Sequence, residues 1–148
     1  MSALKSLLII GVAVVAIGAI GFFLLGLSSQ SGSAPGLADG RLAPCPGSPN
    51  CVSSEEGTPA EKKVDPLTAS SWAAIPATIG AMGGTVTQQS EDYIAAEFKS
   101  ALFGFVDDVE FRNAGDAVQV RSASRVGYSD AGVNAARVQE LGARLSAQ

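Results

Sequence analysis

The sequence predicts an α+β protein: an N-terminal transmembrane helix, then a small domain in which two helices flank a four-stranded antiparallel sheet. Three observations lead to this fold class. The chain opens with a long apolar run, its second half contains stretches of alternating apolar and polar residues, and apolar residues at helical spacing lie before and after those stretches. Helices that cover one face of an antiparallel sheet are the economical architecture for such an order. We therefore expect helix, four strands and helix after the apolar run.

The apolar run, "LLIIGVAVVAIGAIGFFLLGL", covers residues 7–27 and carries no charge. At 1.5 Å per residue it spans a hydrocarbon core of ~30 Å. Lys5 precedes the run and the next basic residue is Arg41, so the positive-inside rule places residues 1–6 in the cytoplasm and the rest of the chain outside. A cleavable signal peptide, cut at small residues near Ala34, is the alternative, although its apolar region would be shorter.

Residues 28–40, "SSQSGSAPGLADG", are expected to form a flexible linker because Gly, Ser, Ala and Pro dominate them. The exported domain then covers residues 41–148. Near its start, Cys45 and Cys51 enclose "CPGSPNC". A disulfide is the first hypothesis for two such cysteines in an exported protein, and two unlinked thiols are the alternative. A redox pair would have two intervening residues, and a metal site would need further ligands.

Composition excludes several classes of function. The formal net charge is -4, which does not suit a nucleic-acid-binding surface. The chain has no histidine, and this removes histidine-based triads, general bases and metal ligands. We therefore predict no catalytic residues, no metal site and no cofactor.

Two helices are predicted in the exported domain. The first follows Thr68, and Pro76 fits it if the helix begins late enough to place the proline in the first turn. Its apolar face carries Trp72, Ile75, Ile79 and Met82. The second runs from Asp130 or Ala131 to Leu145, and the side chain of Asp130 can cap it.

Four strands are predicted between these helices, at 85–89, 93–100, 106–112 and 117–125. "NAGD", residues 113–116, is the expected hairpin turn between the last two. With this turn, the predicted ladder pairs Arg112 with Ala117, Glu110 with Gln119, and Asp108 with Arg121. Paired residues point to the same face, so the outer face should carry acids on one strand beside arginines on the next.

Alternation divides the remaining polar residues between the two faces of the sheet. Asp107 should lie on the core side, near Ser122 or Ser124, with Arg137 of the last helix as its partner. The acidic members of this predicted structural network are Asp107, Asp108, Glu110 and Asp130. Because they are split between faces, a hard-metal site or a glycosidase-type acid pair is disfavoured.

"VRSASRVGYSDAGVN", residues 120–134, is the densest polar stretch of the chain. One interpretation is a cleft that binds an anion, a sugar or a partner, built from Arg121, Arg125, Tyr128, Asn134 and Arg137. The other is scaffolding, in which the same residues form a salt-bridged sheet face and a capped helix, since surface charge pairs are common and of modest value.

Three motifs in order, "CPGSPNCVSS", "FGFVDDVEFR" and "VRSASRVGYSDAGVN", resemble domain-of-unknown-function family 1499 of bacteria and photosynthetic organisms. The resemblance covers residues 42–145 and implies a fold-level identity without a reaction. The matching positions are Cys45, Pro49, Asn50, Cys51, Asp107, Asp108, Glu110, Phe111, Arg121, Ser122, Ser124, Arg125, Gly127, Tyr128, Asp130, Gly132, Asn134 and Arg137. Ala135 departs from the family, which typically has a basic residue there, so an anion site would be weaker in this chain.

We therefore expect a single-pass protein of the bacterial inner membrane whose non-enzymatic periplasmic domain binds an envelope ligand or protein partner. The first alternative is a hydrolase or transferase that acts on envelope glycans or lipids with Asp107 or Asp108 as acid and base. The second alternative is a purely structural domain.

Overall fold

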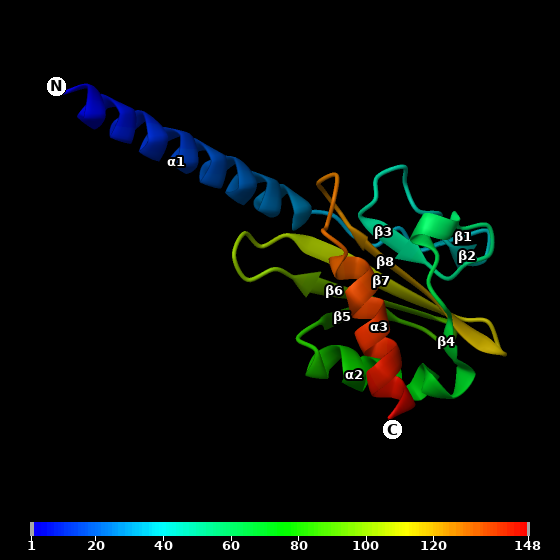
Figure 1. The fold of residues 1–148 in the computed structure, drawn as a ribbon. Helices are drawn as coiled ribbons and strands as arrows, with labels where there is room; N and C mark the ends of the chain where they lie inside the picture. The colour runs from blue at the N-terminus through cyan, green and yellow to red at the C-terminus, as the bar shows by residue number, and fades with distance from the viewer. Residues whose placement is uncertain (1, 148) are drawn as a thin grey trace.

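The computed structural model describes residues 2–147. It confirms an α+β architecture in which one long apolar helix, α1 (Ala3–Ser29), projects from a folded domain. Figure 1 shows α1 extending away from the domain, and of its residues Gly26 and Ser29 are buried. The helix is four residues longer at its N-terminal end and two residues longer at its C-terminal end than the predicted span of 7–27. Its length and composition would allow it to cross a membrane, a property that anchors and N-terminal signal sequences share.

The domain is built on a six-stranded antiparallel sheet rather than the predicted four. Five strands run in the spatial order β3-β8-β7-β6-β5, and β4 also pairs with β8. Their bounds are β3 (Cys51–Ser53), β4 (Leu67–Thr68), β5 (Thr85–Gln89), β6 (Tyr93–Lys99), β7 (Val106–Asn113) and β8 (Ala117–Ser124). The prediction missed β3 and β4 because strands of two or three residues are too short to show alternation. As a result, β8 lies inside the sheet and not at its edge.

Two α-helices cover one face of the sheet, as predicted (Figure 1). They are α2 (Ile75–Ala81), which follows the 3-10 turn η2 (Ala69–Ala74), and α3 (Val133–Ser146). Pro76 lies in the first turn of α2, where its missing N–H does no harm. A second 3-10 turn, η1 (Ala60–Lys62), precedes β4. The core between helices and sheet includes the fully buried Ile75, Ile79, Ile94, Phe111 and Leu141.

The β7–β8 hairpin differs from the predicted register by two residues. Glu110 pairs with Arg121, Arg112 with Gln119, and Asp108 with Ala123. The turn is tighter than expected, because Ala114 donates its N–H to the carbonyl of Ala117 and only Gly115 and Asp116 lie between them. A shift of two keeps every side chain on its predicted face, so the division of polar and apolar residues stands while the partners change.

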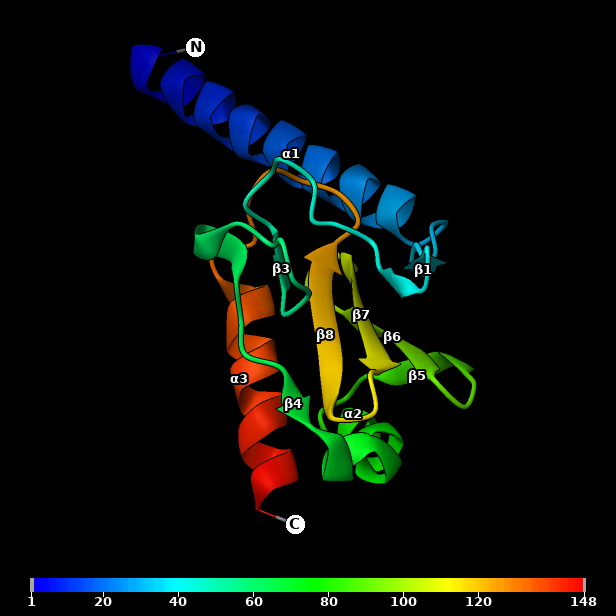
Figure 2. The ribbon, with the colours of Figure 1, turned by 90° about the vertical axis from the view of Figure 1, so that its right-hand side faces the viewer.

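The opposite face of the sheet is covered by the chain that follows α1. This segment contains the small ribbon of β1 (Leu37–Ala38) and β2 (Arg41–Leu42), and Figure 2 shows it across the sheet from α3. Leu42 is buried against Tyr93 and Ala95 of β6. Part of the predicted linker, residues 28–40, therefore packs on the domain and helps to shape its polar face.

Candidate functional site

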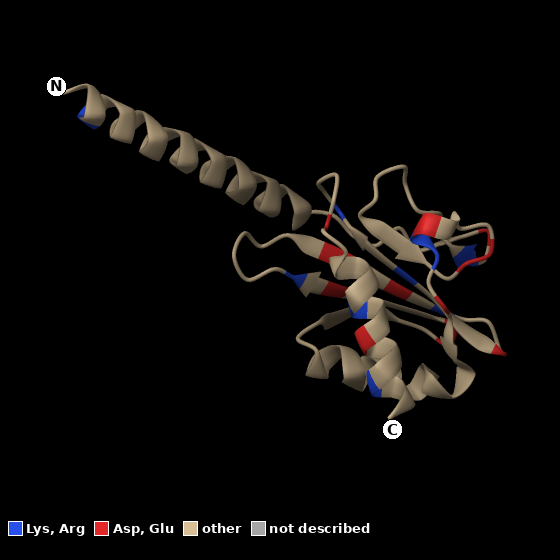
Figure 3. Cartoon of the chain, viewed as in Figure 1, with Lys and Arg blue, Asp and Glu red and all other residues tan. Residues whose placement is uncertain are grey.

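The polar residues of the sheet form ion pairs beneath the segment that follows α1. Figure 3 shows acidic and basic positions on neighbouring strands, whereas α1 is uncharged beyond its first turns. We call this side of the sheet the polar face. Its charged side chains are Glu97, Asp108, Glu110, Arg112, Arg121 and Arg125.

Arg125 is the centre of the first group of ion pairs. Its Nε and Nη2 donate to the two carboxylate oxygens of Asp108 at 2.8 and 2.7 Å, and Nη2 also contacts Glu97. Its Nη1 donates to the carbonyl of Ser29 at 3.1 Å, at the end of α1, where a cation complements the helix dipole. The hydrogen bonds to Asp108 and Glu97 raise the pKa of Arg125 above its ordinary value, against the effect of burial.

Glu110 is the centre of the second group and is fully buried. Its carboxylate accepts hydrogen bonds from Arg121 Nη1 at 2.8 Å, from the Tyr93 hydroxyl at 2.7 Å and from the backbone N–H of Gly36 at 2.9 Å. Burial, followed by the neighbouring Glu110, raises the pKa of the Tyr93 hydroxyl, which stays a neutral donor. The Gly36 contact fastens the segment after α1 to the sheet.

A third pair ties the β2 region to the sheet. Arg112 donates through Nε and Nη2 to Glu55 at 2.7 and 3.0 Å, and Glu55 also accepts from the backbone N–H of Leu42. Burial raises the pKa of Glu55, but the hydrogen bonds from Arg112 and Leu42 outweigh burial and leave the pKa below its ordinary value.

On the helix-covered side, the predicted partner of Asp107 is confirmed. Arg137 Nη2 lies 2.7 Å from Asp107, and the guanidinium also stacks over the ring of Phe98 at 4.7 Å. Its Nη1 donates to the side-chain oxygen of Asn134. Asp107 and Asp108 therefore point to opposite sides of β7, and each carboxylate is held by a different arginine.

Asn134 is fully buried, and its side chain joins four parts of the chain. Its amide nitrogen donates to the carbonyl of Asn50, to Ser124 Oγ and to Asp130, while its oxygen accepts from Ser122. Asp130 also accepts a hydrogen bond from the backbone N–H of Asn134, in the first turn of α3. The N-cap position of α3 is held by Gly132, so Asp130 satisfies the helix N-terminus from two residues earlier in the chain. This is a structural role.

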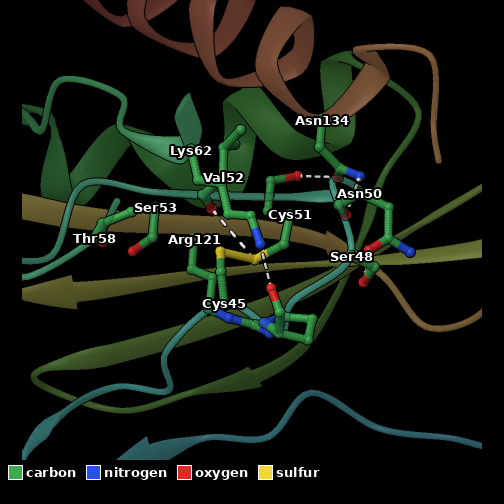
Figure 4. Close-up of a disulfide and its surroundings, with 12 residues drawn as sticks. Cys45, Ser48, Asn50, Cys51, Val52, Ser53, Thr58, Lys62, Arg121 and Asn134 are labelled. Atoms are coloured by element: carbon green, nitrogen blue, oxygen red, sulfur yellow. Dashed lines mark hydrogen bonds between the residues drawn. A yellow bond between two sulfur atoms is a disulfide. The ribbon is translucent and has the colours of Figure 1, made fainter. Parts of the chain in front are cut away.

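The cysteine loop joins the same network. Cys45 and Cys51 form a disulfide, and Cys51 pairs with Ala123 of β8. Figure 4 shows the disulfide beside Lys62 and Arg121, with Asn50 next to Asn134. Lys62 donates to the carbonyl of Pro46 inside the loop. The first and third sequence motifs are therefore held together.

One pocket opens on the polar face, with a volume of about 400 Å³. Residues 28–35 and Pro46 form one wall, and Asp108, Arg121 and Arg125 form the other. Arg121 is 6% exposed, and its Nε is the buried side-chain nitrogen that has no hydrogen-bond partner within residues 2–147. Buried N–H donors are nearly always hydrogen-bonded in folded proteins, so a donor without a partner beside a pocket is unusual.

The structure does not bring the five predicted ligand-binding residues into one cleft. Arg121 and Arg125 line the pocket, whereas Asn134 and Arg137 lie on the other side of the sheet. Tyr128 is 77% exposed in the loop between β8 and α3. Residues 2–147 contain no cluster of three or more acidic, cysteine or histidine side chains that could hold a metal ion.

Sequence reasoning missed the pocket wall at residues 28–35 and the carboxylate of Glu97. The composition of residues 28–35 is typical of flexible tethers and predicts a linker. Glu97 lies beside Asp108 because β6 pairs with β7. Only a predicted order of strands could have revealed it.

Comparison with known proteins identifies a family. No curated protein and no solved structure resembles the chain closely enough to match it. The family model described as "Protein of unknown function (DUF1499)" matches residues 41–145, which is the folded domain from β2 through nearly all of α3. The chain therefore belongs to the DUF1499 family.

Proposed function

We propose that this protein is a membrane-anchored binding protein whose pocket on the polar face holds a neutral, oxygen-bearing ligand outside the cytoplasm. The observation that carries the proposal is Arg121, which lines a pocket next to the end of α1 and whose buried Nε–H has no partner among residues 2–147. Serine hydroxyls at Ser31 and Ser33 line the same pocket and would add donors and acceptors.

The charges around the pocket favour a neutral ligand over an anion. Arg121 and Arg125 are two cations among three carboxylates, those of Glu97, Asp108 and Glu110. A phosphate or carboxylate would meet an excess of negative charge there. Hydroxyl, amide or ether oxygens, as in a sugar, would accept from Arg121 without that repulsion.

The ion pairs also favour binding over catalysis. A general acid or base needs a carboxylate that is free to exchange its proton at the site. Asp107 and Asp108 are each held by an arginine and lie on opposite sides of β7. A purely structural role is the second candidate, because the same ion pairs fasten the segment after α1 to the sheet.

Location outside the cytoplasm is supported by the disulfide, since oxidising compartments preserve such bonds. Retention of α1 is supported by Ser29, which is buried and accepts hydrogen bonds from Val106 and Arg125. A peptidase cut near Ala34 would remove these contacts. We therefore place the domain in the periplasm, anchored to the inner membrane by residues 7–27.

The proposal can be tested by NMR on the full-length chain in detergent micelles, using the arginine Nε–H resonances. Chitotriose, a neutral oligosaccharide, should shift the Arg121 signal, and inorganic phosphate should leave it unchanged. Arg112 is the internal control, because its Nε is bonded to Glu55 away from the pocket. An Arg121 signal that neither probe shifts would favour the structural role, and a response to phosphate alone would overturn the neutral-ligand proposal.

A further inference from the structure

The loop between β6 and β7, residues 100–105, carries apolar side chains on a firmly held turn. Its sequence is "SALFGF", and Leu102 at its tip is 80% exposed. Ser100 donates its N–H to the carbonyl of Phe105 and accepts from the N–H of Phe105 through its hydroxyl. The loop therefore presents Leu102 outward in a defined position.

The loop packs directly against α1. The ring of Phe103 stacks on Phe22 with centroids 5.5 Å apart, and Phe105 meets the same ring edge-on at 6.3 Å. The two backbones also touch at Gly26, where an added Cβ would lie 1.8 Å from the carbonyl oxygen of Phe103. Only glycine permits this approach.

The position of Phe22 in the apolar run fixes the depth of the loop. Phe22 lies five residues before Leu27, the last residue of the run, which corresponds to about 7–8 Å along a helix. The side chain of Phe103, which stacks on Phe22, must lie at the same depth in the membrane as Phe22. Water cannot surround an exposed leucine in that region, but lipid chains can.

We propose that residues 100–105 form a tip that inserts into the bilayer leaflet holding the C-terminal end of α1. The occupant of the exposed apolar surface at Leu102 is lipid. This inference rests on the proposed membrane anchorage of α1, because only a helix in the membrane brings the loop to lipid.

Lys99 and the loop that contains Tyr128 fit the same placement. Lys99 precedes the loop and donates from Nζ to Gln30, just beyond the apolar run, where its charge would lie at the headgroups. Figure 1 shows the loop between β8 and α3, which contains the exposed Tyr128, beside the domain end of α1. Tyrosine is enriched at this level of membrane proteins. The domain would thus sit against the membrane in one orientation.

Spin labelling of the full-length chain in vesicles of phosphatidylethanolamine and phosphatidylglycerol tests the proposal. A nitroxide would be attached to variants that each carry one added free cysteine, Leu102→Cys, Val15→Cys or Ala114→Cys, with the native disulfide intact. Val15 reports on the anchor, and Ala114 lies exposed at the far end of β7. The labels at 102 and 15 should collide more with dissolved oxygen than with a water-soluble nickel chelate, and the label at 114 should do the reverse.

A label at 102 as accessible to nickel as that at 114, with the label at 15 in lipid, would overturn insertion and leave the anchor standing. Labels at 15 and 102 that are both in water would overturn the anchor as well. A matched glycine pair adds a second test. Gly26→Ala should push the loop from α1 and move the label at 102 toward water, whereas Gly21→Ala, with nothing within 4 Å of its added Cβ, should not. Equal behaviour of the two variants would contradict the contact.

Discussion

Arg125 uses every nitrogen of its guanidinium group within the protein: two hold Asp108, one of these also contacts Glu97, and the third donates to Ser29. Arg125→Ala leaves the buried carboxylate of Asp108 and the half-buried carboxylate of Glu97 without their cation. We expect the free energy of unfolding to fall by about 3–5 kcal/mol. The measurement is urea unfolding of the full-length chain in detergent micelles, followed by the fluorescence of Trp72, the one tryptophan.

Arg41→Ala is the matched control for Arg125→Ala. Arg41 pairs with Glu56 at 3.3 Å, but both side chains are largely exposed. Its removal should change the free energy of unfolding by less than about 1 kcal/mol. If the two variants were equally stable, Arg125 would not serve as scaffolding, and a ligand-binding role for it would gain support.

Asp130 should make stability depend on pH. Burial would raise the pKa of its carboxyl, but hydrogen bonds from Asn134 and Gly132 outweigh burial and leave the pKa below its ordinary value. A lowered folded-state pKa stabilises the protein above the unfolded pKa of about 4, and this stabilisation is lost as pH falls through the folded value. The free energy of unfolding should therefore decrease as the pH falls below about 5.

Asp130→Asn separates this contribution from that of the other carboxyl groups. The variant should be less stable than the unaltered chain at neutral pH and should show a shallower loss of stability on acidification. Urea unfolding at a series of pH values gives both quantities. Parallel stability curves for the two chains would rule out a linked proton at Asp130.

At the scale of the elements, the disulfide fastens the edge strand β3 next to β8. It closes a short loop, for which chain entropy gives about 2 kcal/mol. The double variant Cys45→Ser, Cys51→Ser should lose about this much free energy of unfolding. A reducing agent should destabilise the unaltered chain to the same extent and leave the variant unchanged; an equal effect on both would show that the reductant acts elsewhere.

The sequence predicted the strands and the faces of their side chains better than it predicted which residues pair across the strands. Alternation in β7 and β8 placed Asp107 with Arg137 on the helix side and the outward acids beside arginines. It could not choose between two registers that differ by two residues, because both keep Val109, Phe111 and Val120 in the core. The two-residue turn at Gly115 and Asp116 sets the register of the hairpin. In this register Glu110, and not Asp108, pairs with Arg121.

The candidate site was harder to predict than the fold because two of its parts have no local signature. The pocket wall at residues 28–35 has the composition of a linker, and packing on the sheet is what orders it. Asn134 is predicted as a ligand-binding residue, yet it is fully buried and donates to the carbonyl of Asn50, 84 positions earlier in the chain. Contacts between residues so far apart in the sequence depend on how the strands and helices are arranged, which local sequence patterns do not predict.

At the scale of the whole molecule, α1 and the domain behave as one folded unit. Gly26, Ser29 and Gln30 all contact the domain, and Ser29 Oγ accepts the N–H of Val106 at the start of β7. An anchor joined through a free tether would leave domain stability unchanged when it is removed. Here its removal takes away Ser29, which accepts the N–H of Val106 and one of the N–H groups of Arg125.

Deletion of residues 2–29 should therefore lower the free energy of unfolding of the domain by about 1–3 kcal/mol, because a hydrogen bond to a charged group and one to a backbone N–H are exchanged for water. Deletion of residues 2–18 is the control, since it shortens the apolar helix but keeps Phe22, Gly26 and Ser29 in place. Urea unfolding of both chains in the same detergent compares them. Equal stability of the two truncated chains would mean that the helix is only a tether, and the orientation of the domain at the membrane would then have to come from the loop alone.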